Sequence, residues 1–86
     1  MYNLITRYIN NMTINDVNNF AISKGINLEE NELEFTYSFI KNNYKDILKN
    51  PKLLDLDRYQ NKYTKENFEK ISKVFNEYSK KYSHLL

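Results

Sequence analysis

Hydrophobic residues recur every three or four positions along most of the chain, and no stretch alternates between hydrophobic and polar residues as a half-buried strand does. This spacing is typical of helices that bury one face. In the first segment, about residues 2–11, the stripe comprises Leu4, Ile5, Tyr8, Ile9 and Met12. We therefore predict an amphipathic first helix.

A second helix is predicted to begin after Thr13. The Thr13 hydroxyl can accept the backbone N–H of Asp16, three residues later, as in a capping box. Met12 and Val17 lie at the two positions of a hydrophobic staple around this cap. The side chains that this helix is expected to bury are Val17, Phe20 and Ala21.

The second helix is predicted to end at Gly25, the only glycine of the chain. Glycine adopts a positive φ without strain, which suits the residue that follows the last turn of a helix. We expect Ile26 to fold back onto Ala21 as the apolar contact of such an ending. A new cap formed by Asn27 with Glu30 is predicted to begin a long third helix that continues to about residue 49.

The third helix carries two apolar stripes. One comprises Leu33, Tyr37, Ile40, Tyr44, Ile47 and Leu48. The other, on nearly the opposite side, comprises Leu28, Phe35 and Phe39. A helix that is apolar on two sides either lies at the centre of the fold or keeps one stripe for a partner.

Asn50-Pro51 interrupts this pattern and restarts it, because proline fits the first turn of a helix, where its missing N–H costs nothing. A short helix is predicted over about residues 51–59. The side chains it would bury are Leu53, Leu54 and Leu56.

The last helix is predicted to begin after Thr64, with Tyr63 and Phe68 as its staple pair. Its apolar stripe comprises Phe68, Ile71, Phe75, Tyr78 and Tyr82. Taken together, the patterns predict an all-α fold: a single domain over residues 1–86, built as a bundle of four to five helices with the long third helix at its centre.

Composition removes most enzyme chemistries. The 86 residues include no Cys and a single His, His84, third from the end of the sequence. The chain therefore has no disulfide framework and no thiol nucleophile. No signal-peptide pattern and no apolar run of membrane-spanning length is present. We expect a cytoplasmic, non-enzymatic protein that does not engage a membrane and needs no cofactor or metal.

Net charge is only +2, but it is unevenly distributed. Residues 29–34 hold four Glu and no cation, whereas residues 41–86 hold 11 Lys and Arg against 6 Asp and Glu. A start of the third helix so rich in carboxylates would be repelled by DNA phosphates. A basic face on the later part of this helix is the better nucleic-acid candidate, and it comprises Lys41, Lys45, Lys49 and Lys52.

Protein binding is the function that the pattern favours most. An exposed aromatic cluster marks an interface, and Leu28, Phe35 and Phe39 would form one if no other helix covers them. The chain is thus predicted to be an interaction or regulatory module with an unknown protein partner. Two alternatives stay open: nucleic-acid binding through the basic face, and self-association through the stripe of the last helix.

Two ranges of the chain, residues 12–40 and 63–78, carry a resemblance to a known family. In the first range it consists of Thr13, Val17, Phe20, Ala21 and Ile26, and in the second of Ile71, Val74, Phe75 and Tyr78. In these positions the chain resembles the small bacterial YqfT-like proteins of unknown function. This resemblance implies a small cytoplasmic helical protein and brings no activity, cofactor or site residue.

Overall fold

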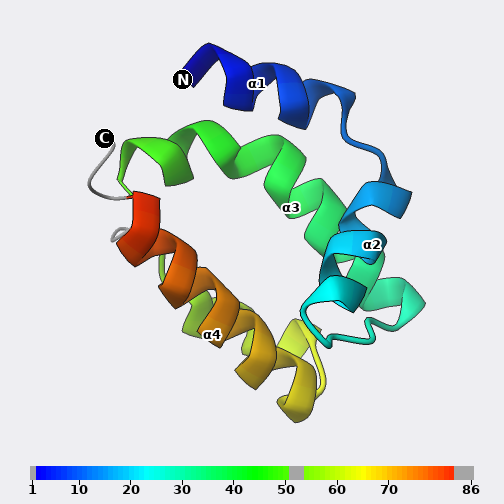
Figure 1. Ribbon diagram of the computed structural model, residues 1–86. Coiled ribbons are helices and arrows are strands. Elements are labelled where there is room, and N and C mark those ends of the chain that lie inside the picture. Colours follow the sequence, from blue (N-terminus) through cyan, green and yellow to red (C-terminus); the bar gives the residue numbers. More distant parts are fainter. Residues whose placement is uncertain (1, 51–53, 83–86) are drawn as a thin grey trace. The chain divides into compact units, whose positions relative to one another are not determined.

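Helices make up the structure, a computed structural model that describes residues 2–50 and 54–82, without the side chains of residues 2, 3, 5, 48 and 82. In chain order the elements are α1 (Tyr2–Asn11), α2 (Ile14–Ser23), α3 (Glu30–Lys49), the 3₁₀ helix η2 (Leu56–Lys62) and α4 (Lys65–Tyr82) (Figure 1). The described residues include no strand, which confirms the all-α prediction. None of these helices has the length and apolar character needed to cross a bilayer.

Two compact units make up the chain, Met1–Lys45 and Asp46–Leu86, and the boundary between them falls inside α3. The first unit contains α1, α2 and most of α3. The second contains the end of α3, η2 and α4. A single domain over residues 1–86 stays a prediction.

The start of α2 is formed as the sequence predicts. Asp16 N–H donates to Thr13 Oγ1 at 3.1 Å, and Thr13 N–H donates to Asp16 Oδ2 at 2.9 Å, so both bonds of the capping box are present. Met12 and Val17, the staple positions, are both buried. The cap thus satisfies two backbone donors while the staple fixes how the chain enters the helix.

The end of α2 is also confirmed. Gly25 has φ +75°, and its N–H donates to Ile22 O at 2.9 Å. Ile26 N–H reaches back to Ala21 O at 2.8 Å, and the side chains of Ile26 and Ala21 are both buried. This pair of bonds is the Schellman ending, which needs the left-handed conformation that glycine adopts without strain.

The start of α3 differs from the prediction. The helix begins at Glu30, two residues after the start that an Asn27 cap implies. Glu29 N–H donates to Glu32 Oε1 at 2.7 Å. This is the capping-box bond that a Glu at the third position of a helix makes to the backbone of the residue before the helix. The sequence offers this spacing twice, at 27/30 and at 29/32. Burial distinguishes them, because Glu32 is only 1% exposed whereas Glu30 is exposed.

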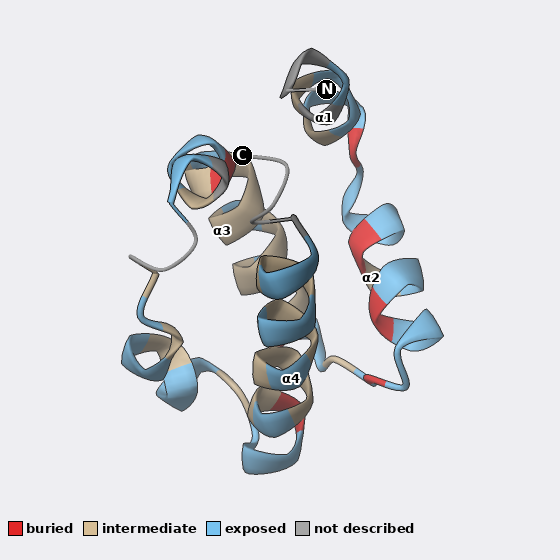
Figure 2. Cartoon of the chain, turned by 60° about the vertical axis from the view of Figure 1, so that its left-hand side comes forward, coloured by how far each residue is buried: buried red, intermediate tan, exposed pale blue. Residues whose placement is uncertain are grey.

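Both stripes of α3 are at least partly covered. Tyr44 is buried, and the other described apolar side chains of this helix are half-buried: Leu33, Phe35, Tyr37, Phe39, Ile40 and Ile47. Leu48, which was predicted to continue the first stripe, lies outside the described side chains. The prediction of a helix that is apolar on two sides is therefore confirmed as far as it is described (Figure 2).

In the second unit, the short helix lies later than predicted. Residues 54 and 55 are not helical, and η2 runs from Leu56 to Lys62 as a 3₁₀ helix. Asp55 causes the shift, because its Oδ1 accepts the N–H of Asp57 at 3.2 Å and so caps a new start. Leu54 and Leu56 are half-buried rather than buried, and Leu53 lies outside the described residues.

The last helix, α4, begins as predicted. Asn67 N–H donates to Thr64 Oγ1 at 3.2 Å, and the Tyr63 and Phe68 rings lie 6.5 Å apart between centroids. η2 packs against α4. On the outer surface, Lys70 pairs with Glu66 at 3.6 Å, one helical turn away.

Candidate functional site

Large apolar side chains are exposed on α1 and α2, not on α3. Their exposed fractions are Leu4 66%, Tyr8 63%, Ile22 53%, Phe20 47% and Ile14 39%. All five belong to the first unit, where α1 and α2 show mostly exposed surface (Figure 2). Leu4 and Tyr8 line one hollow together with Asp16 of α2, and we call this surface the α1–α2 apolar face. At about 100° per residue, Phe20 and Ile22 lie about 160° apart on α2, so they do not form one patch with each other. Contiguous apolar surface marks a binding site more often than scattered single residues do.

Sequence reasoning placed Phe20 in the core, and this was wrong. At about 100° per residue, Phe20 lies about 60° from Val17 and about 100° from Ala21, so it sits at the edge of the buried stripe. Val17 and Ala21 are buried, whereas the Phe20 ring faces outward with Lys24 Nζ 5.7 Å from its centroid. The periodicity of α2 alone does not tell how wide a stripe its neighbours cover.

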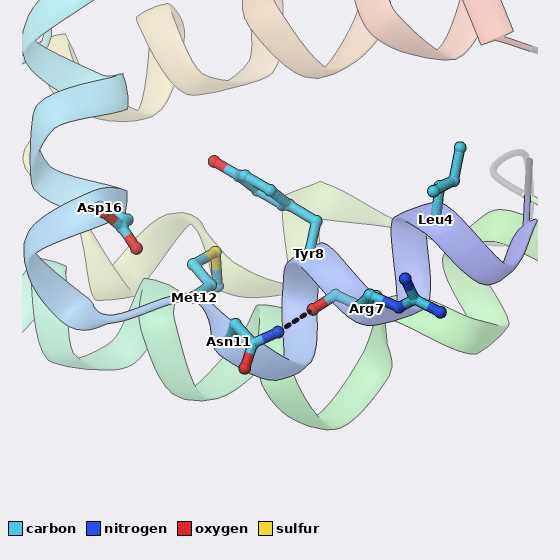
Figure 3. Close-up of a pocket in the computed structure, with 6 residues that line it drawn as sticks. All are labelled: Leu4, Arg7, Tyr8, Asn11, Met12 and Asp16. Atoms are coloured by element: carbon cyan, nitrogen blue, oxygen red, sulfur yellow. Dashed lines mark hydrogen bonds between the residues drawn. The ribbon is translucent and has the colours of Figure 1, made fainter.

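A hollow of about 410 Å³ opens beside the apolar residues of α1. Its lining residues are Leu4, Arg7, Tyr8, Asn11, Met12 and Asp16. Figure 3 shows the Leu4 and Arg7 side chains at one end, Asp16 at the other, and Tyr8 and Met12 between them. Leu4 and Tyr8 share one side of α1 because they lie four residues apart, and Met12 follows directly after the end of the helix.

Charge at this hollow is confined to its two ends. Arg7 is the only charged residue of α1, and its guanidinium forms no ion pair within the part of the chain that the structure describes. Its backbone carbonyl accepts the Asn11 side-chain amide at 3.0 Å. Asp16 has one carboxylate oxygen in the capping box of α2. The hollow therefore has an apolar middle, a cation at one end and an anion at the other.

The interface predicted from the sequence is less accessible than this face. Leu28, Phe35 and Phe39 are each half-buried. The Phe35 and Phe39 rings lie 5.9 Å apart between centroids, with their planes tilted by 34°. The two rings thus cover part of each other's apolar surface, and the three residues form a partly covered stripe rather than an open patch.

The four lysines of the predicted basic face are not equivalent. Lys41 Nζ donates to Asn10 O at 2.9 Å and lies 5.7 Å from the centroid of the Tyr37 ring. Its charge therefore meets the negative end of α1, where a cation is favourable. Lys45 and Lys49 are exposed, and Lys52 lies outside the described residues. Of the predicted basic face, the structure therefore shows two exposed cations, Lys45 and Lys49.

A second hollow, of about 430 Å³, lies in the second unit. Its lining residues are Gln60, Tyr63, Lys65, Phe68 and Glu69. The Tyr63 and Phe68 rings provide its apolar part, and the charges of Lys65 and Glu69 are opposite in sign. This mixture of polar and apolar groups favours no particular class of ligand.

The sequence analysis did not identify Leu4 and Tyr8 as exposed residues, nor Glu32 as a buried one. Leu4 and Tyr8 follow the expected helical spacing, so the local pattern carries no signal that separates them from covered residues. The 29/32 capping spacing is the signal that could have pointed to Glu32. Within residues 2–50 and 54–82, no three acidic, His or Cys side chains gather into a metal site. Among the described residues, the exposed large apolar side chains lie on α1 and α2.

Comparison with protein-family models, curated proteins and solved structures finds no match to this chain. The resemblance to YqfT-like proteins stays a prediction.

Proposed function

We propose that this protein is a non-enzymatic interaction module that binds another protein chain through the α1–α2 apolar face. The exposure of Leu4 and Tyr8, each more than 60%, is the observation that carries the proposal. If both residues belonged to the core of the fold, their large side chains would be buried. Their exposure leaves apolar area that a second surface can bury.

Burial of that area would supply the free energy of binding. Each square ångström of apolar surface removed from water contributes about 25 cal/mol. Tyr8 and Arg7 are also the residue types that dominate the energy of protein interfaces, because they combine large contact area with a polar end. The hollow of about 410 Å³ beside them is shallow and open, so both side chains are accessible to a partner. An interface centred on Tyr8 is thus supported by exposure as well as by composition.

The test begins with the whole tagged protein as bait in a native lysate, followed by identification of what it retains. The retained protein is then purified, and its affinity is measured directly against wild type and against the double variant Leu4→Ser/Tyr8→Ser. We expect the variant to bind about 10- to 100-fold more weakly, since two central apolar contacts are removed.

Two controls make this result specific. Asn10→Ser changes an exposed side chain of the same helix and keeps the backbone carbonyl that Lys41 contacts, so its affinity should match wild type. Phe35→Ser/Phe39→Ser tests the interface predicted from the sequence. A Leu4→Ser/Tyr8→Ser variant that is folded by circular dichroism and binds as tightly as wild type would refute the proposed surface.

A further inference from the structure

We infer, on the basis of the proposed function, that the occupant of the α1–α2 apolar face is a second copy of this chain. The two copies would be related by a two-fold axis that passes through the hollow beside Tyr8. In such an interface the same patch is used twice, so that residue i of one copy contacts residue j of the other and the reverse.

Charge complementarity selects this occupant. The hollow has Arg7 at one end and Asp16 at the other, with Tyr8 and Met12 between them (Figure 3). Rotation by half a turn about the middle exchanges the two ends. Arg7 of one copy then meets Asp16 of the other, and this contact occurs twice. A surface with one cation and one anion at opposite ends is therefore complementary to itself.

Both charged groups have the capacity for this contact. The Arg7 guanidinium forms no ion pair among residues 2–50 and 54–82, and it carries five N–H donors. Asp16 Oδ2 accepts the Thr13 N–H, and a carboxylate has further lone pairs for an arginine. The capping box thus holds the Asp16 carboxylate in place without using all of its acceptor capacity.

The apolar middle of the face also suits a second copy. A two-fold axis beside Tyr8 brings this ring toward its own symmetry mate, and aromatic pairs add stability beyond the area they bury. Leu4 of each copy would lie toward the α2 end of the other. The net charge of +2 per chain is small, so the repulsion between two copies is weak.

The experiment is a charge exchange in the full chain, measured by sedimentation velocity from about 1 µM to about 1 mM, the range of weak to moderate affinities. Arg7→Glu alone and Asp16→Lys alone each place like charges at both contacts. We expect each variant to dimerise at least about tenfold more weakly than wild type. A mixture of the two variants restores opposite charges at both contacts, and we expect it to form a heterodimer.

Controls separate this charge effect from loss of folding. Lys45→Glu makes a charge reversal at an exposed residue of α3 and should leave dimerisation unchanged. Asp16→Asn removes the charge but keeps an oxygen that can accept the Thr13 N–H, so it should weaken the dimer and leave the cap of α2 intact. If circular dichroism shows Asp16→Lys to be unfolded, Asp16→Asn is used in its place. A dimer that is not weakened by Asp16→Asn then contradicts the inference.

Three outcomes would overturn the inference: a wild type that stays monomeric at the highest concentration, an Arg7→Glu variant that dimerises like wild type, or a mixture no more dimeric than its components. The proposed function fails separately. If wild type is monomeric but Leu4→Ser/Tyr8→Ser loses a purified heterologous protein, the face binds that other protein. If wild type is monomeric and the variant loses nothing, both proposals are wrong.

Discussion

Single residues that punctuate the helices are the part of this fold most directly tied to the sequence. Thr13 and Asp16 satisfy each other's backbone N–H groups, and Gly25 and Ile26 satisfy carbonyls at the other end of the same helix. These bonds join residues at most five apart, so they need no distant part of the chain to form. This is why the limits of α2 could be predicted from sequence alone.

Gly25 gives a prediction at this scale. A Cβ added to Gly25 would meet no atom within 4 Å, so the cost of Gly25→Ala is confined to the backbone conformation at φ +75°. We expect a loss of about 1–2 kcal/mol in the free energy of unfolding, the cost of a left-handed alanine. Urea denaturation measures it. Gly25→Asn is the matched control and should lose less, because Asn tolerates this conformation; equal losses would point to a cause other than φ.

At the scale of whole elements, prediction succeeded for the existence of helices and was less accurate for where they start and which side they expose. The 29/32 and 27/30 spacings both fit a cap before α3, and the burial of Glu32 distinguishes them. Leu4 and Tyr8 have the same spacing as core residues, yet α1 exposes them. Coverage of a helix depends on its neighbours, and a local pattern does not contain that information.

The start of α3 can be tested through Glu32. Glu32→Ala removes the oxygen that accepts the Glu29 N–H at 2.7 Å, and we expect the free energy of unfolding to fall by about 1–3 kcal/mol. Glu32→Gln keeps an acceptor at the same position and should lose less. Thermal and urea denaturation of both variants decide the matter: if Gln costs as much as Ala, the negative charge rather than the hydrogen bond stabilises this turn.

For the molecule as a whole, the uneven charge leaves nucleic-acid binding as the main alternative to protein binding. Lys45 and Lys49 are the exposed cations of the predicted basic face, whereas Lys41 contacts a carbonyl of α1. Two phosphate contacts give only a shallow dependence of affinity on salt, with a slope of about −2 on logarithmic axes for duplex DNA.

Fluorescence anisotropy with labelled DNA and RNA at low salt tests this alternative. If the basic face binds nucleic acid, Lys45→Glu/Lys49→Glu should abolish the signal, while Leu4→Ser/Tyr8→Ser should leave it intact. We expect flat titrations for wild type, because two exposed lysines on a chain of net charge +2 attract a polyanion weakly. Binding that survives physiological salt would contradict this expectation.

The contact between Lys41 and α1 has an evolutionary consequence. Its acceptor is the backbone carbonyl of Asn10, not the Asn10 side chain. Any residue at position 10 supplies the same carbonyl, whereas most replacements at position 41 remove the donor. Substitutions at the two positions therefore need not compensate each other. Methods that find neighbouring residues through correlated variation would not detect this hydrogen bond between α3 and α1.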